Sequence, residues 1–200
     1  MSNEFYNASG YPANSDEGQA SDLRAELLAI QAAMDKLPAL LGKGNAMIVV
    51  NPGGTGLTSL PISLGTYQPV FTFTTVGNLT IVYSIQDGYY VRLGPLVLVA
   101  IRLQMSTFTH TTASGNAQIS LPPGLAPTAV NNAAATMSIH GQGITKVNYT
   151  QVNGLINSVN TIQLVARGSA QAEVAITTAD MPTGGGPSFS GSVIYRTDAP

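Results

Sequence analysis

Residues 96–105 decide the fold, and they read Leu-Val-Leu-Val-Ala-Ile-Arg-Leu-Gln-Met. Apolar side chains occupy every second position from Val97 to Met105, while Arg102 and Gln104 lie between them. A period of two residues is typical of a β-strand that turns one face toward a core. The sequence therefore predicts a strand whose buried face consists of Val97, Val99, Ile101, Leu103 and Met105.

The same alternation extends on both sides of this stretch, from residue 66 onward. Residues 71–74 and 79–85 alternate in the same way, and Asp87-Gly88 predicts a tight hairpin before residues 89–93. Six more strands are expected, separated by turn residues such as Asn153-Gly154, at residues 117–121, 133–140, 144–149, 161–167, 172–177 and 190–195. No helical pattern interrupts them. Residues 65–200 are therefore predicted to form a jelly-roll-like antiparallel β-sandwich.

The composition points to a neutral, polar surface. Charged residues make up 9% of the 200 residues, whereas about 25% is usual for a globular domain. Ser, Thr, Asn and Gln together fill 59 positions. The formal net charge of −2 leaves no basic cluster that could neutralise phosphates, so we expect no nucleic-acid partner.

Membrane insertion and secretion are not expected either. The longest apolar stretch, residues 93–101, is broken by Gly94 and Pro95 and is much shorter than the roughly 18 residues of a membrane span. The polar start of the sequence lacks the charged and apolar regions of a signal peptide. The absence of Cys excludes disulfides and thiolate metal sites.

The first 46 residues differ from the rest, because they hold nine of the 18 charged side chains. Residues 5–12 read Phe-Tyr-Asn-Ala-Ser-Gly-Tyr-Pro, in which Gly10 and Pro12 prevent a regular element. Aromatic side chains in an irregular tail require a partner surface for their burial. Phe5, Tyr6, Tyr11 and Pro12 are therefore candidate anchoring residues.

A short helix is predicted at about residues 19–37, ending before Pro38. Its apolar residues are spaced 4, 3, 4, 3 and form a heptad seam: Leu23, Leu27, Ile30, Met34 and Leu37. Such a short helix is marginal alone in water. It is expected to pack on copies of itself, on the β domain or on a larger assembly. The alternative is an ordinary amphipathic helix that lies on its own domain.

The segment between helix and β domain is predicted to contain one strand and a linker. Residues 46–50 form a short β-branched run suited to pairing between subunits. Residues 51–56 are rich in Gly, but no Gly-Lys-Ser/Thr follows, so we interpret them as a linker rather than a phosphate loop. The predicted organisation is an N-terminal segment at 1–46, strand and linker at 47–64, and the β domain at 65–200.

Few residues could carry catalysis or bind a metal. The carboxylates of the β domain are Asp87, Glu173, Asp180 and Asp198, and each has an explanation in a turn, strand, loop or chain end. His110 and His140 are the only histidines. Each is interpreted as a half-exposed side chain at a strand or loop edge. The alternative is a metal bound by copies of one His on an oligomer axis, and the sequence favours neither His. We expect a non-enzymatic protein without a cofactor.

The tyrosines leave two interpretations open. Tyr among Asn, Ser and Gly is the composition of surfaces that contact sugars or proteins, but packing explains the same residues equally well. The six in the β domain are Tyr67, Tyr83, Tyr89, Tyr90, Tyr149 and Tyr195.

Several motifs resemble those of bacteriophage tail-fibre and virion-fibre proteins. In the β domain they lie at residues 65–69, 88–97, 119–122, 176–180 and 189–195, and in the first piece at 5–12, 23–27, 35–38, 49–51 and 54–57. The resemblance thus runs in order along most of the chain. The chain departs from this pattern at residues 183–187, where a polar segment leading into a strand is usual, and it lacks a long shaft.

The resemblance implies a homotrimeric virion protein on the particle surface, assembled in the host cytoplasm. Its N-terminal segment would bind capsid, portal, adaptor or tail proteins, and its β knob would adhere to a host surface glycan or protein. The alternative is a capsid decoration or head-fibre protein that stabilises the shell. A glycan-degrading tailspike would need paired acids and a longer repetitive chain.

Overall fold

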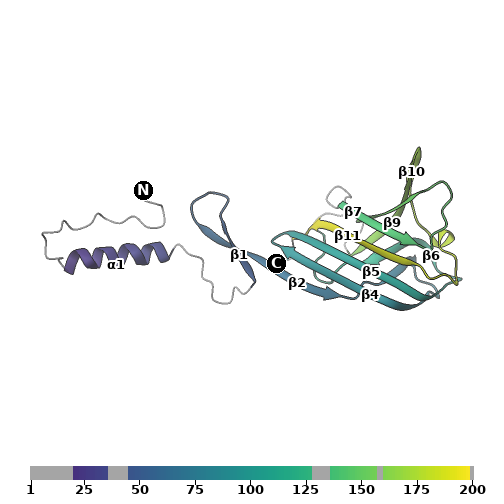
Figure 1. Ribbon diagram of the computed structural model, residues 1–200, viewed down its shortest axis with the longest axis horizontal. Coiled ribbons are helices and arrows are strands. Elements are labelled where there is room, and N and C mark those ends of the chain that lie inside the picture. The colour runs from purple at the N-terminus through teal and green to yellow at the C-terminus, as the bar shows by residue number, and fades with distance from the viewer. Residues whose placement is uncertain (1–19, 36–44, 128–135, 157–159, 199–200) are drawn as a thin grey trace. The chain divides into compact units, whose positions relative to one another are not determined.

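The computed structural model describes residues 20–35, 45–127, 136–156 and 160–198 (Figure 1). The chain divides into two compact units, Met1–Ile62 and Ser63–Pro200.

The first unit contains one helix and one hairpin. Helix α1 spans Ala20–Met34, strand β1 spans Ala46–Val50, and strand β2 begins at Leu57 and ends at Tyr67 in the second unit. Strands β1 and β2 pair antiparallel from Ala46 opposite Pro61 to Val50 opposite Leu57. Residues 51–56, expected to be a linker, form the turn of this hairpin. The Asn51 N–H donates a hydrogen bond to the Gly56 carbonyl, and the Asn51 carbonyl accepts one from the Gly54 N–H, each at 2.9 Å.

The second unit is a two-layer antiparallel sandwich, as predicted. One layer follows the order β2-β4-β5-β11-β7 and the other the order β8-β9-β6-β3, with β10 paired to β9 (Figure 1). The strands of this unit are β3 Phe71–Thr75, β4 Thr80–Leu93, β5 Leu96–Thr109, β6 Ser114–Ser120, β7 Thr136–Gln142, β8 Gln151–Ile156, β9 Thr161–Gly168, β10 Gln171–Ala175 and β11 Ser188–Arg196. The layers join where β7 pairs β8 through Ile139 and Val152.

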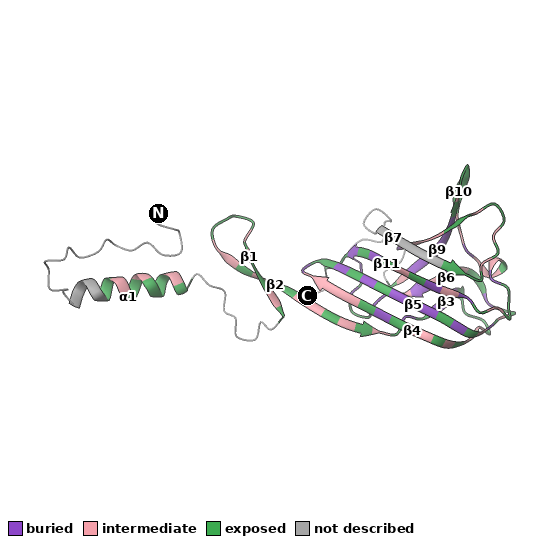
Figure 2. Ribbon diagram, viewed as in Figure 1, coloured by how far each residue is buried: buried purple, intermediate pink, exposed green. Residues whose placement is uncertain are grey.

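Strand β5 alternates between buried and exposed residues along its length (Figure 2). The predicted core face is confirmed, because all five of its members are buried: Val97, Val99, Ile101, Leu103 and Met105. Strand β5 therefore contributes five residues to the core of the sandwich.

Phenylalanines from both layers meet in the core. Phe71 of β3 stacks on Phe189 of β11, with ring centroids 5.5 Å apart, and contacts Phe73 and Phe108 edge-on. Edge-on and stacked aromatic pairs are each worth about 0.5–1.5 kcal/mol beyond the area they bury. Because β3 and β11 belong to different layers, this cluster ties the two layers together.

The hairpin predicted at Asp87-Gly88 is wrong. Strand β4 passes through both residues, and Gly88 lies opposite Ile101 of β5. The turn comes instead at Gly94-Pro95, between the paired Leu93 and Leu96. Gly94 has the positive φ of 57° that a two-residue turn with glycine first requires. Gly88 instead leaves room for the Tyr67 ring, since a Cβ at this position would lie 2.4 Å from that ring.

The structure also corrects two predictions around residue 150. Residues 144–149, expected as a strand, form a loop, whereas Asn153-Gly154, expected as a turn, lie within β8. Strand β8 pairs β9 from Gln151 opposite Arg167 to Ile156 opposite Ile162. Residues 162–166 of β9 are buried, so its backbone groups need strand partners on both edges. That requirement outweighs the turn preference of Asn-Gly.

Gly88→Ala is expected to lower the free energy of unfolding by roughly 1–3 kcal/mol, because the added methyl group must displace the packed Tyr67 ring. Urea unfolding measures the change. Gly185→Ala is the control, since a Cβ there meets only the Pro182 carbonyl at 3.5 Å. In a Tyr67→Ala background the same Gly88→Ala change should cost much less. Equal costs in both backgrounds would contradict this assignment.

Candidate interaction surfaces

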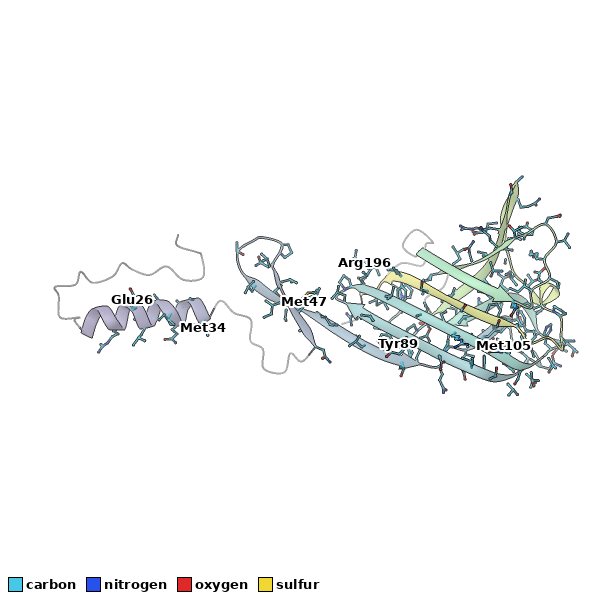
Figure 3. All side chains as sticks on the ribbon, viewed as in Figure 1. Glu26, Met34, Met47, Tyr89, Met105 and Arg196 are labelled. Carbon is cyan, nitrogen blue, oxygen red and sulfur yellow. The ribbon has the colours of Figure 1, made fainter. Side chains whose placement is uncertain are left out.

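The outer face of the β4–β5–β11 layer carries exposed apolar residues at one end. Tyr89, Leu96, Leu98 and Ile194, here called the sheet-face patch, are between 38% and 60% exposed. Figure 3 labels Tyr89 on β4. Leu64 of β2, the strand next to β4, is exposed as well.

The strand register makes the sheet-face patch contiguous. Leu98 lies opposite Val91 of β4 and opposite Ile194 of β11, and Leu96 lies opposite Leu93. Directly paired side chains on one face are about 4.5–5.5 Å apart at Cβ, so these residues touch or nearly touch across three strands. A continuous apolar area on a sheet face is typical of an interaction surface rather than of free solvent exposure.

The other end of the same face is polar. Arg102 lies opposite Asp87 of β4 and opposite Ser190 of β11, and all three residues are exposed. The boundary falls between this row and the row of Tyr89 and Ala100. An apolar area bordered by exposed polar residues has the anatomy of a protein–protein interface.

Helix α1 also exposes apolar side chains. Leu27, Ile30 and Met34 of the predicted seam are exposed, and so is Leu28 beside it. The side chain of Leu23 and the whole of Leu37 lie outside what is described, as do the candidate anchors Phe5, Tyr6, Tyr11 and Pro12. The seam and the anchor therefore stay predictions.

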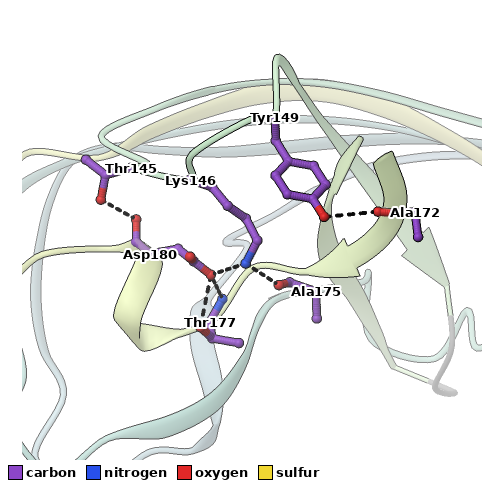
Figure 4. Close-up of polar contacts among 7 residues, drawn as sticks. All are labelled: Thr145, Lys146, Tyr149, Ala172, Ala175, Thr177 and Asp180. Atoms are coloured by element: carbon purple, nitrogen blue, oxygen red, sulfur yellow. Dashed lines mark hydrogen bonds and ion pairs between the residues drawn. The ribbon is translucent and has the colours of Figure 1, made fainter. Parts of the chain in front are cut away.

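A partly buried ion pair, Lys146–Asp180, is the centre of a polar site (Figure 4). Lys146 Nζ lies 2.7 Å from Asp180 Oδ2 and also donates to the Ala175 carbonyl. The same Asp180 oxygen accepts hydrogen bonds from the Thr177 N–H and hydroxyl at 2.8 and 2.9 Å. Asp180 sits at the end of a short 3₁₀ turn, η2, Thr178–Asp180. The pair fastens the loop at residues 144–149 to this turn.

Opposing effects set the pKa of the Asp180 carboxyl. Burial alone raises it, but the hydrogen bonds from Lys146 and Thr177 together outweigh burial and hold the pKa below the usual aspartate value. Both side chains are less than a fifth exposed. An ionised carboxylate that is saturated with donors fits a structural clamp, not a proton-transferring group.

The other candidate polar residues have structural partners too. Glu173 of β10 forms an ion pair with Arg167 of β9. His110 Nε2 donates to the Met181 carbonyl at 2.8 Å, since a carbonyl oxygen only accepts, and its ring contacts Phe73 and Phe108 edge-on. The His140 side chain is not described. Among the described residues, no three His, Asp or Glu side chains gather closely enough to hold a metal ion.

Most of the tyrosines contribute to packing. Tyr67 donates to the Ser120 carbonyl, Tyr195 to the Leu125 carbonyl and Tyr149 to the Ala172 carbonyl. Tyr83 accepts a hydrogen bond from the Phe71 N–H at 2.9 Å. Burial raises the pKa of Tyr67, Tyr83 and Tyr195. Tyr89 differs, because it is 60% exposed within the sheet-face patch.

Leu96, Leu98 and Ile194 were missed as interface residues, although the sequence contains a signal. Between residues 96 and 101, the positions that alternate with the core face are Leu96, Leu98 and Ala100, and they are apolar as well. Strands that are apolar on both faces are typical of sheets covered on both sides. Across the parts of the chain that are described, no helix is long and apolar enough to cross a membrane.

Comparison with known proteins adds one fold relationship. No family model matches the sequence, and no curated protein matches it. The crystal structure of the Dettilon tailspike protein (gp208) is similar, with a TM-score of 0.53 and 16% sequence identity. The similarity covers 68% of this chain and 24% of that chain, so this chain spans about a quarter of the length of the tailspike. At this identity the likeness shows a shared fold.

Asp180→Asn is expected to lower the free energy of unfolding by roughly 2 kcal/mol at pH 7, because the charge-assisted bonds to Lys146 and Thr177 are lost. The pKa of Asp180 is lower in the folded chain, so its ionised form stabilises the fold above about pH 4 and loses this effect as the pH falls further. Urea unfolding from pH 7 to pH 3 should therefore show wild type and variant converging. Asp198→Asn, at an exposed side chain, is the control. If the free energies of unfolding of Asp180→Asn and wild type differ by the same amount at every pH, the proposed role of the Asp180 charge is contradicted.

Leu98→Asp is expected to reduce the mass of the assembled protein in solution, because it places a charge in the centre of the sheet-face patch. Sedimentation equilibrium measures the mass. Gln104→Asp adds the same charge on the polar end of the same face and should leave the mass unchanged. An unchanged mass for Leu98→Asp would show that this patch is not a contact between copies.

Proposed function

We propose that this chain is a structural bacteriophage protein that forms a short trimeric fibre or spike on the virion surface. The observation that carries the proposal is the contiguous sheet-face patch, because a charge-poor β unit with an open apolar face needs a partner. The chain shares its fold with about a quarter of a phage tailspike, and this likeness supports the proposal of a structural phage protein.

The proposed partners of the sheet-face patch are the other two copies of this chain in a trimer. Most homo-oligomers are closed and symmetric, so a ring of three copies covers the same patch on every copy. The exposed Leu27, Ile30 and Met34 of α1 suit a second contact between copies, since residues spaced three and four apart share one helix face.

The N-terminal segment and the β knob are proposed to bind different partners. The aromatic residues Phe5, Tyr6 and Tyr11, with Pro12, bind a capsid, portal, adaptor or tail protein. The β knob is displayed outward and adheres to a host surface glycan or protein. Its few charges and many Ser, Thr, Asn and Gln residues limit nonspecific electrostatic attraction, which suits a particle that must stay dispersed.

The proposed role is adhesive and structural rather than enzymatic. Asp180 and Glu173, two of the four carboxylates of the β unit, are engaged in ion pairs with Lys146 and Arg167. General acid–base catalysis instead needs ionisable groups that converge on a substrate. Asp180 and Glu173 instead fasten a loop and a short strand.

The anchor is tested with the full-length variant Phe5→Ala/Tyr6→Ala/Tyr11→Ala. It should keep the oligomeric mass of the wild type but be absent from purified particles, because the aromatic contacts that hold it are lost. Mass spectrometry of gradient-purified virions measures the copy number relative to the major capsid protein.

The control for the anchor variant is Asn3→Ala/Asn7→Ala/Asn14→Ala, which changes the same segment without removing an aromatic ring. It should remain on particles. Normal incorporation of the aromatic variant would refute the anchor. An image of the particle in which the β unit is buried against the shell would favour the decoration role instead.

A further inference from the structure

The β1–β2 hairpin of the first unit is apolar on both of its faces. Ile48 and Val50 share one face with Leu57, which lies opposite Val50. Met47 shares the other face with Leu60, which lies opposite it. Met47, labelled on the hairpin in Figure 3, is 39% exposed, and Val50 is 62% exposed.

A two-stranded hairpin is at best marginally stable alone in water. Edge strands are usually protected by charged side chains, above all Lys. This hairpin has no such protection, because no charged residue occurs between Lys43 and Asp87. β1 also lies at the end of the strand order, so one of its edges has no strand partner among the described strands. Its apolar faces, lack of charge and unpaired edge are therefore those of a hairpin that is covered by a protein partner.

The turn holds the hairpin in one register. The Asn51 side-chain oxygen accepts a hydrogen bond from the Thr55 N–H at 2.9 Å, and its amide donates to the Thr55 hydroxyl at 3.1 Å. Gly54 has a positive φ of 66°, which glycine adopts without strain. Each apolar residue is thus fixed on one face, as a specific contact requires.

We propose that the two faces of this hairpin are covered by the same hairpin of sister copies, so that it clamps the oligomer together. This inference rests on the proposed trimer. In a closed ring every copy has two neighbours, so sister hairpins can reach both faces of each one. A single foreign surface would have to cover two opposite faces at once.

The absence of charge favours a second copy over a foreign partner. When three copies of one segment gather around a three-fold axis, each charged side chain approaches its own equivalents, and like charges repel. A foreign partner would instead gain specificity from complementary charges on the hairpin. Neutrality from residue 44 to residue 86 is therefore what contact between identical hairpins requires.

Cross-linking of the full-length protein tests the clamp, because the chain has no native Cys. The variant Ile48→Cys/Leu60→Cys places one thiol on each face and is treated with a short bis-maleimide. It should give covalently linked dimers and trimers on a denaturing gel. The control Gly53→Cys, in the turn, should give at most a trace of linked species.

Ile48→Lys gives an independent readout. It should raise the concentration at which the oligomer dissociates by at least about tenfold, because a buried lysine would be unpaired. Gly53→Lys is the matched control and should dissociate like wild type. Sedimentation equilibrium over a dilution series measures both.

The outcomes separate this inference from the proposed function. A trimeric wild type whose Ile48→Cys/Leu60→Cys variant links no better than Gly53→Cys would overturn the clamp and leave the trimer standing. A lowered melting temperature of Ile48→Lys with an unchanged dissociation concentration would overturn the clamp too. A monomeric wild type would overturn both proposals.

Discussion

Strand β5 imposes the main constraint on this molecule, because its residues 96–101 are apolar on both faces while the described residues bury only the inner one. Val97, Val99 and Ile101 fill the core of the sandwich, whereas Leu96 and Leu98 point outward with Ile194 beside them. The inner face explains why two layers form. The outer face carries exposed apolar area of the kind that is typical of interaction surfaces, and it is the basis of the proposed contact between copies.

Two of the ion pairs of the second unit lie at its less regular parts. Lys146 and Asp180 fasten a loop that contains no strand, and Arg167 and Glu173 join β9 to the short β10. Elsewhere, aromatic packing and backbone pairing are sufficient. The stacked Phe71 and Phe189 connect the layers without any ion pair. Among the described residues, the ion pairs of the second unit thus lie at a loop, between β9 and the short β10, and near the end of β11.

Local pattern predicted the sandwich and the core face of β5, because both follow from a two-residue period. Local pattern predicted turns wrongly where contacts between residues distant in sequence outweigh the turn preference of a dipeptide. Asp87-Gly88 stays extended because Tyr67 packs against Gly88, and Asn153-Gly154 stays extended because β9 needs a strand partner. Leu98 and Ile194 are far apart in sequence, so only the strand register shows that they form one patch. The anchoring segment stays a prediction from sequence.

The exposed apolar surfaces also constrain the symmetry of the assembly. With a net charge of −2, the chain has little electrostatic repulsion to keep copies apart in solution. A head-to-tail contact that does not close would propagate into filaments, and an uncharged edge strand such as β1 would pair without limit. Closure into a ring ends both processes, because every patch then meets a neighbour. The proposed closed oligomer therefore fits a composition that makes the isolated chain prone to association.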